Sequence, residues 1–172
     1  MQFDRSDCQS GRRGQGEMND LSDLVAPGAI MPRLLATSRR QALQMMSETL
    51  AKAAGIDARA VFDAILIRER LSGTGMNEGV AVPHASVPGL ARSVGAFARL
   101  EPAQDFDSLD GRPVDLVFML ITPPDRGADH LKALARVSRF LKRPDMREKL
   151  RAARGGDELY ALIAGSVRVD AA

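Results

Sequence analysis

Aromatic residues are scarce in this sequence of 172 residues, which has no tryptophan, one tyrosine and six phenylalanines. Proteins that bind single-stranded nucleic acids stack bases on aromatic side chains, so this scarcity argues against that class. The charge agrees, because the net charge is only +2 and no long block of like charges is present. We therefore expect an aliphatic core and no nucleic-acid partner.

Cysteine and long apolar runs are scarce too. The single Cys8 cannot form a disulfide framework, and a chain of this length buries enough surface to fold without one. No apolar run approaches the roughly 20 residues that cross a bilayer, so we expect no membrane insertion. Only two histidines are present, and the expected domain contains no cysteine, which disfavours a structural zinc site.

The N-terminal residues differ from the rest of the chain. Residues 1–17 are polar, rich in Gly, Ser and Arg, and show no periodicity. They lack the apolar stretch of a signal peptide, so we interpret them as a disordered extension or an upstream leader. The folded domain is expected over residues 18–164, with residues 165–172 as a frayed tail.

Within that domain, strand and helix patterns alternate. Strands are expected at residues 30–36, 80–84, 94–100 and 114–122, the last of which is apolar almost throughout. Helices are expected between Ser38 and Gly55, from Asp57 to about residue 70, from about His130 to Arg143, and over residues 145–154 and 157–164. The pattern predicts a single α/β domain with helices on both faces of a small sheet.

Helical spacing also predicts which side chains are buried. In the second helix these are Val61, Ile65 and Leu66, and in the helix near His130 they are Leu131, Leu134, Ser138 and Leu141. The charged clusters 68-RER-70 and 139-RFLKR-143 are interpreted as solvated helix ends.

Both histidines lie where α/β sheets bind ligands. His130 begins a helix after the central strand, where free backbone N–H groups suit an anion, and His84 follows Pro83, which stiffens the strand end. Arg68 precedes the Gly-rich turn 72–79, where the backbone can approach an anion closely. Each feature alone has a structural explanation. Together they favour phosphoryl transfer to histidine, which needs positioning and positive charge.

Two longer segments resemble a known family. The segment 68-RERLSGTGMNEGVAVPH-84 resembles the active-site signature of the IIA proteins of the bacterial phosphotransferase system, fructose/mannitol family. The segment 130-HLKALARVSRFLKRPDMREKLRAA-153 resembles the helix that carries that family's second histidine. The likeness covers about residues 18–164. The opening MNDLSDLVAP and the tract DFDSLDGRPVDLVFML are similar to the nitrogen-regulatory type of this family.

The resemblance implies a mixed sheet of about five strands in a cytoplasmic phosphotransferase-system component that uses no cofactor or metal. By resemblance, His84 would accept the phosphoryl group, and His130 would orient the nucleophile or hydrogen-bond that group. Arg68 would contact the phosphoryl oxygens, with Thr74 as a further candidate donor. The partners implied are an HPr-like phosphocarrier and regulated target proteins, such as sensor kinases or potassium-transport regulators.

Two alternatives stay open. One is a sugar-specific IIA component that feeds a fructose/mannitol-type permease, and the other is a poorly phosphorylated protein-binding regulator. The second alternative follows from departures in the signature: the order of small residues in 72-SGTG-75 is exchanged, and Asn77 and Ala85 replace usual glycines. Glu78 adds a carboxylate, which would repel a phosphoryl group if it pointed inward and would be harmless if it pointed outward.

Overall fold

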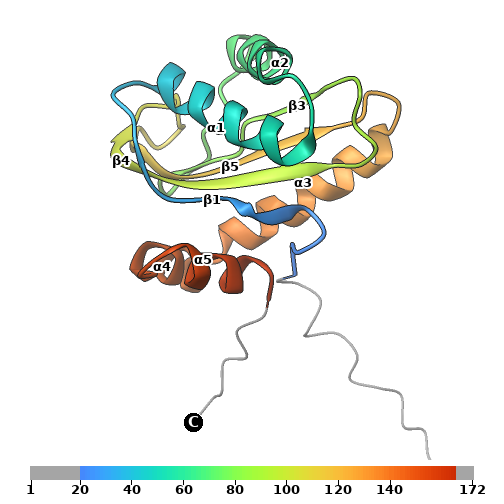
Figure 1. Cartoon of the computed structure of the whole chain (residues 1–172). Helices are drawn as coiled ribbons and strands as arrows, with labels where there is room; N and C mark the ends of the chain where they lie inside the picture. Colours follow the sequence, from blue (N-terminus) through green and yellow to red (C-terminus); the bar gives the residue numbers. More distant parts are fainter. Residues whose placement is uncertain (1–19, 166–172) are drawn as a thin grey trace, which may run out of the picture.

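The computed structural model describes residues 20–165, in which a mixed β-sheet lies between two layers of helices (Figure 1). The expected extension 1–17 and residues 166–172 of the expected tail lie outside the described residues. Within residues 20–165, no helix is both long enough and apolar enough to cross a membrane.

The sheet has five strands: β1 (Val25–Leu35), β2 (Val80–Ala81), β3 (His84–Ser86), β4 (Val94–Gln104) and β5 (Val114–Thr122). β4 runs parallel to β1 and antiparallel to β5. β2 and β3 both pair in parallel with the other side of β5, so they form one edge strand that is interrupted at Val82 and Pro83. β5 is buried at every position except Asp115, as its apolar sequence predicted.

The helices cover both faces of the sheet, which confirms the predicted fold class. α1 (Arg39–Ala54) and α2 (Ala58–Leu71) lie on one face (Figure 1). α3 (Gly127–Lys142), α4 (Pro144–Ala152) and α5 (Gly156–Ile163) lie on the opposite face.

The predicted starts of the first two helices are confirmed by their caps. The Ser38 hydroxyl accepts the N–H of Gln41 at 3.0 Å, and the Asp57 carboxylate accepts the N–H of Ala60 at 3.1 Å. Gly55 ends α1 in the left-handed conformation with φ of 70°. These three helix boundaries are therefore encoded by the residues next to them.

Several sequence expectations about strands and burial were wrong in detail. β1 starts at Val25 rather than residue 30, because an edge strand tolerates prolines such as Pro27 and Pro32. Leu131 is 68% exposed, because α3 packs through Ala133, Val137, Phe140 and Leu141, and residue 131 lies about 180° around the helix from residue 140. Leu66 is only partly buried, since the inward positions of α2 are spaced by four and end at Glu69, and Leu134 and Ser138 of α3 are also only partly buried.

Arg99 on β4 connects the sheet to the C-terminal end of α4. Its guanidinium donates to the carbonyl of Pro32 at 2.8 Å. It also donates to three carbonyls at the end of α4, those of Leu150, Arg151 and Ala153, at 3.1, 3.1 and 2.7 Å. The last carbonyls of a helix have no intrahelical partner, so Arg99 supplies the missing donors.

Candidate functional site

His84 is the first residue of β3 and pairs with Leu120 of β5. Its ring nitrogen Nδ1 lies 2.8 Å from the carbonyl oxygen of Val82. A carbonyl can only accept, so Nδ1 carries the proton and Nε2 keeps its lone pair. Pro83 lies between the two residues and restricts the backbone there. The break between β2 and β3 thus fixes the tautomer of His84.

His130 lies in the first turns of α3, beside His84. The two ring centroids are 5.5 Å apart and the rings are tilted by 46°. The Nδ1 atom of His130 lies 2.6 Å from the hydroxyl oxygen of Thr122, the last residue of β5, which is fully buried. The ends of β3, β5 and α3 therefore bring both imidazoles to one place, so that a group bonded to one ring can contact the other.

Both imidazoles favour the neutral form. Burial lowers the pKa of His84 below its usual 6.5, and the positive charges of Arg68 and of protonated His130 oppose protonation further. The hydrogen bond to Val82 acts in the opposite direction and is the smaller effect than burial. Burial and Arg68 also lower the pKa of His130. At neutral pH the site therefore contains an unprotonated Nε2 on His84.

Positive charge reaches the histidines from Arg68, near the end of α2. Its Nη1 atom donates to the carbonyl of Ser72 at 2.8 Å, and its charge affects the pKa of both rings. The first turn of α3 adds backbone donors. The N–H of His130 is the first to bond within the helix, to the carbonyl of Arg126, so the N–H groups of residues 127–129 have no intrahelical acceptor. Neutral imidazoles beside a guanidinium and a helix start suit an anionic group.

Thr74 is buried, and its hydroxyl donates to the carboxylate of Glu69. Its carbonyl accepts the N–H of Val82 at 3.1 Å. In this structure the hydroxyl proton of Thr74 is thus occupied by Glu69 and is not offered to the histidines.

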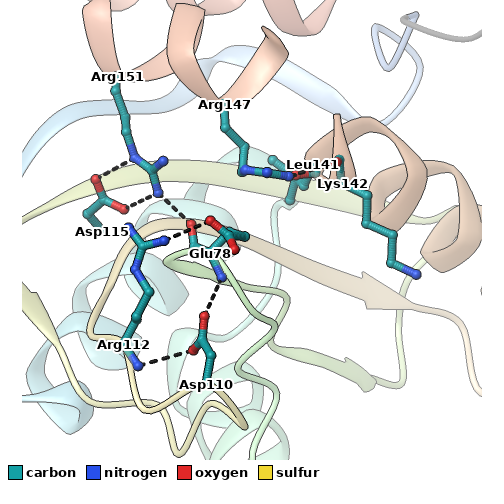
Figure 2. A network of polar contacts seen from close by, with 8 residues as sticks. All are labelled: Glu78, Asp110, Arg112, Asp115, Leu141, Lys142, Arg147 and Arg151. Carbon is teal, nitrogen blue, oxygen red and sulfur yellow. Dashed lines mark hydrogen bonds and ion pairs between the residues drawn. The ribbon is translucent and has the colours of Figure 1, made fainter. Parts of the chain in front are cut away.

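Glu78 lies in a network of polar contacts with Asp110, Arg112 and Arg151 (Figure 2). Its carboxylate forms an ion pair with Arg112 at 2.7 Å, and its N–H donates to Asp110 at 2.8 Å. Its carbonyl accepts from Arg151, which also binds Asp115 through two nitrogens. These contacts hold Glu78 in a left-handed conformation with φ of 67°.

The register of the sheet separates this network from the site. Val80, which follows the Glu78 turn, pairs with Leu116, whereas His84 pairs with Leu120. Four residues of strand span about 13 Å. The outward orientation of Glu78, one of the two cases considered from the sequence, is the one observed.

Two residues of the site were missed from the sequence. Glu69 was placed in a solvated helix end, yet it is only 6% exposed. The signal for its burial was a repeat of four residues: Val61, Ile65 and Glu69 follow one another at this spacing, and Val61 and Ile65 face the core. Thr122 was read as the end of an apolar strand, although a hydroxyl at the carboxyl end of a central strand is where a ligand site gathers polar groups.

A metal site needs several ligands close together. Among residues 20–165, no three His, Cys, Asp or Glu side chains converge as a candidate metal site. The paired rings of His84 and His130 supply two nitrogen atoms only.

The sequence match to a known family spans the whole region that carries this geometry. Residues 24–166 match the family described as "Phosphoenolpyruvate-dependent sugar phosphotransferase system, EIIA 2". The chain belongs to this family. Both histidines, Arg68 and all the elements of the EIIA 2 fold described above lie inside the match. The resemblance drawn from the signature segment is thereby confirmed.

Several proteins that are similar over most of this chain have names that describe a regulatory role. The chain is 49% identical over 144 residues to a protein of Bradyrhizobium diazoefficiens named "Nitrogen regulatory protein", covering 84% of this chain and 94% of that one. It is 37% identical over 144 residues to the "Nitrogen regulatory protein" of Escherichia coli K12, covering 83% and 88% of the two chains. The crystal structure of nitrogen regulatory protein IIA-Ntr from Neisseria meningitidis superposes with a TM-score of 0.77 at 27% identity, covering 82% of this chain and 97% of that one.

Proposed function

We propose that this chain is a cytoplasmic, nitrogen-regulatory phosphocarrier that accepts a phosphoryl group on Nε2 of His84. The observation that carries the proposal is the hydrogen bond from Nδ1 of His84 to Val82 at 2.8 Å, which leaves Nε2 unprotonated. The lowered pKa of His84 acts in the same direction, because an imidazole nitrogen must be unprotonated to attack.

The donor is the phosphohistidine of an HPr-like carrier. The lone pair on Nε2 of His84 forms the new P–N bond, and the P–N bond of the donor breaks with its electron pair returning to the donor nitrogen. The proton stays on Nδ1 of His84 throughout, in its hydrogen bond to the carbonyl of Val82. In the transition state, the transferred phosphoryl group carries negative charge on its three equatorial oxygens. The reaction therefore needs positive charge and hydrogen-bond donors nearby.

Arg68 and His130 supply those groups. The guanidinium of Arg68, whose charge already reaches both rings, interacts with the phosphoryl oxygens. We assign the hydroxyl of Thr122 as the donor in its 2.6 Å contact with Nδ1 of His130, because this tautomer places an N–H on Nε2 of His130 to bind the same oxygens. Because the rings are 5.5 Å apart, His130 reaches a group on His84 without moving.

Exposed apolar side chains are neighbours of Arg68 and His130 in the sequence and suit a protein partner. Ile67 and Leu71 are 61% and 79% exposed on α2 beside Arg68, and Leu131 is 68% exposed next to His130. Large apolar side chains that face solvent around a reactive group are typical of a docking surface. We assign this surface to the HPr-like carrier, whose phosphohistidine must approach His84 closely.

Regulation follows from the charge that the phosphoryl group adds. It brings about −1.5 to −2 charges to a surface that is otherwise neutral at the histidines, which changes the binding of any partner that docks there. The name "Nitrogen regulatory protein" of the similar proteins favours a regulatory role over feeding a sugar permease. The targets that the family resemblance implies are proteins such as sensor kinases or potassium-transport regulators. The outward orientation of Glu78 supports phosphorylation, because its carboxylate is paired with Arg112 away from His84.

The test is phosphorylation by a phosphorylated HPr-like carrier, followed by intact mass. We expect the mass of one phosphoryl group on the wild-type chain and none on His84→Ala. His130→Ala should fold and accept the group more slowly. If the wild-type chain gains no mass where a related IIA protein does, the phosphocarrier function is refuted and the protein-binding regulator is favoured.

A further inference from the structure

Glu69 is a buried acid that the proposed transfer does not use. It is 6% exposed and is the only buried side chain among residues 20–165 that can carry a charge. Its Oε2 atom is buried without a hydrogen-bond partner in this part of the chain. Burial raises the pKa of Glu69, against the opposing effects of Thr74, Arg39 and Arg68. Burying an acid with one unpaired oxygen destabilises the fold, which points to a function that Glu69 serves.

The other carboxylate oxygen begins a chain of hydrogen bonds. Oε1 of Glu69 accepts from the hydroxyl of Thr74. The carbonyl of Thr74 accepts the N–H of Val82 at 3.1 Å, and the carbonyl of Val82 accepts Nδ1–H of His84 at 2.8 Å. Three consecutive hydrogen bonds thus connect the acid on α2 to the imidazole on β3.

The loop that carries Thr74 has little freedom to compensate. Gly75 forms a bridge to Ala81, and the N–H of Met76 donates to the carbonyl of Val80 at 2.7 Å. On the opposite side of the loop, a Cβ atom on Gly75 would lie 2.6 Å from the carbonyl oxygen of Phe106. A shift of Thr74 would therefore displace Val82, whose carbonyl orients His84.

We propose that Glu69 is a positioning residue for His84, acting through Thr74 and Val82 to fix the orientation and tautomer of the imidazole. The proposal rests on His84 as the phosphoryl acceptor. Its effect on the chemistry is to hold the lone pair of Nε2 toward the donor and to keep the proton on Nδ1. Glu69 itself does not contact the phosphoryl group.

The decisive comparison is Glu69→Leu against Glu69→Gln. Leucine preserves apolar burial but removes the acceptor, whereas glutamine keeps an oxygen where Oε1 lies. We expect Glu69→Leu to lower the phosphorylation rate by about three- to tenfold, the value of one hydrogen bond, and Glu69→Gln to stay within about twofold of wild type. Melting curves confirm that each variant is folded.

The tautomer gives a second measurement that needs no phosphoryl donor. The ¹⁵N chemical shifts of the His84 ring should show Nδ1–H in the wild type and in Glu69→Gln, and a mixture of tautomers in Glu69→Leu. If the wild type is not phosphorylated at all, this measurement still tests the positioning role. Ser47→Ala is the matched control, since Ser47 is also buried but donates to Leu43 within α1, away from His84.

Variants of Thr74 test the hydrogen bond between Glu69 and Thr74 from the side of Thr74. Thr74→Val removes the hydroxyl at nearly constant volume and should match Glu69→Leu, while Thr74→Ser should restore the rate. The double variant Glu69→Leu/Thr74→Val should be no slower than either single variant, because each substitution removes the same hydrogen bond between Glu69 and Thr74. If Thr74→Val slows transfer while Glu69→Leu has the wild-type rate and tautomer, Thr74 contacts the phosphoryl group directly and the positioning role of Glu69 is overturned.

Discussion

The hydroxyl of Thr122 offers a clean perturbation of the second histidine. Thr122 is fully buried at the end of β5, and its oxygen lies 2.6 Å from Nδ1 of His130. Valine has nearly the same shape, so Thr122→Val removes the hydrogen bond and leaves the packing unchanged. The substitution therefore isolates the contact that we propose to hold the Nε2 proton of His130 toward the phosphoryl group.

The expected magnitudes follow from the surroundings of that contact. His130 is only partly buried, so water can reach its freed nitrogen, and the loss of stability should be about 1 kcal/mol. For a domain of this size, that lowers the melting temperature by roughly 2–4 °C. Transfer should slow by up to about tenfold, because an unconstrained ring presents its N–H in the wrong place for part of the time.

The assay is the time course of phosphorylation by intact mass, together with ¹⁵N shifts of the His130 ring. Thr122→Ser keeps the hydroxyl and should behave as wild type. Thr49→Val is a matched control, because the hydroxyl of the partly buried Thr49 donates to the carbonyl of Met45 within α1. A wild-type rate in Thr122→Val, with the wild-type tautomer of His130, would refute the role given to this hydroxyl.

Three further expectations concern stability. Arg99→Met should lower the free energy of unfolding in denaturant by about 2–4 kcal/mol, because four carbonyls lose a charged donor, and an unchanged midpoint would contradict its capping role. Gly95→Ala should cost about 1–3 kcal/mol, because the new Cβ would lie 2.5 Å from a ring carbon of Phe118, and wild-type melting would show that the ring can move aside. Unfolding should become easier as the pH falls below about 6.5, because the pKa of His84 and of His130 is lowered in the folded chain and the unfolded chain binds protons first. His84→Gln should reduce that slope below about pH 6.5, whereas an equal slope would mean that the pKa of the His84 ring is not shifted.

The helices could be predicted because their signals are local. The sheet could not be predicted fully, because strand pairing depends on residues that are distant in the sequence. Ser38, Gly55 and Asp57 act within one turn of themselves, so their effect can be read from neighbouring residues. The antiparallel pairing of β4 with β5 depends on contacts between distant segments, and only the family resemblance implied a mixed sheet. Leu131 was misplaced because apolar side chains were assumed to be buried, whereas this one faces solvent beside the site.

The residues of the candidate site also fall into those that the sequence revealed and those that only the structure revealed. His84 and Arg68 belong to one continuous segment, so their association was visible in the sequence. Thr122 and Glu69 take part through contacts that only folding creates, one across the turn into α3 and the other between α2 and the loop that follows it. A charge inside a basic cluster is ordinarily solvated, and for Glu69 the packing of α2 decided otherwise.

The interrupted strand β2–β3 has a consequence for solubility. It lies at an edge of the sheet, where free N–H and C=O groups would invite a strand from another molecule. Here the loop residues Thr74 to Met76 occupy the outer groups of β2, Pro83 offers no donor, and the ring of His84 takes the carbonyl of Val82. The contacts that prepare the nucleophile therefore also close this edge against aggregation, and variants that loosen the loop should associate more readily.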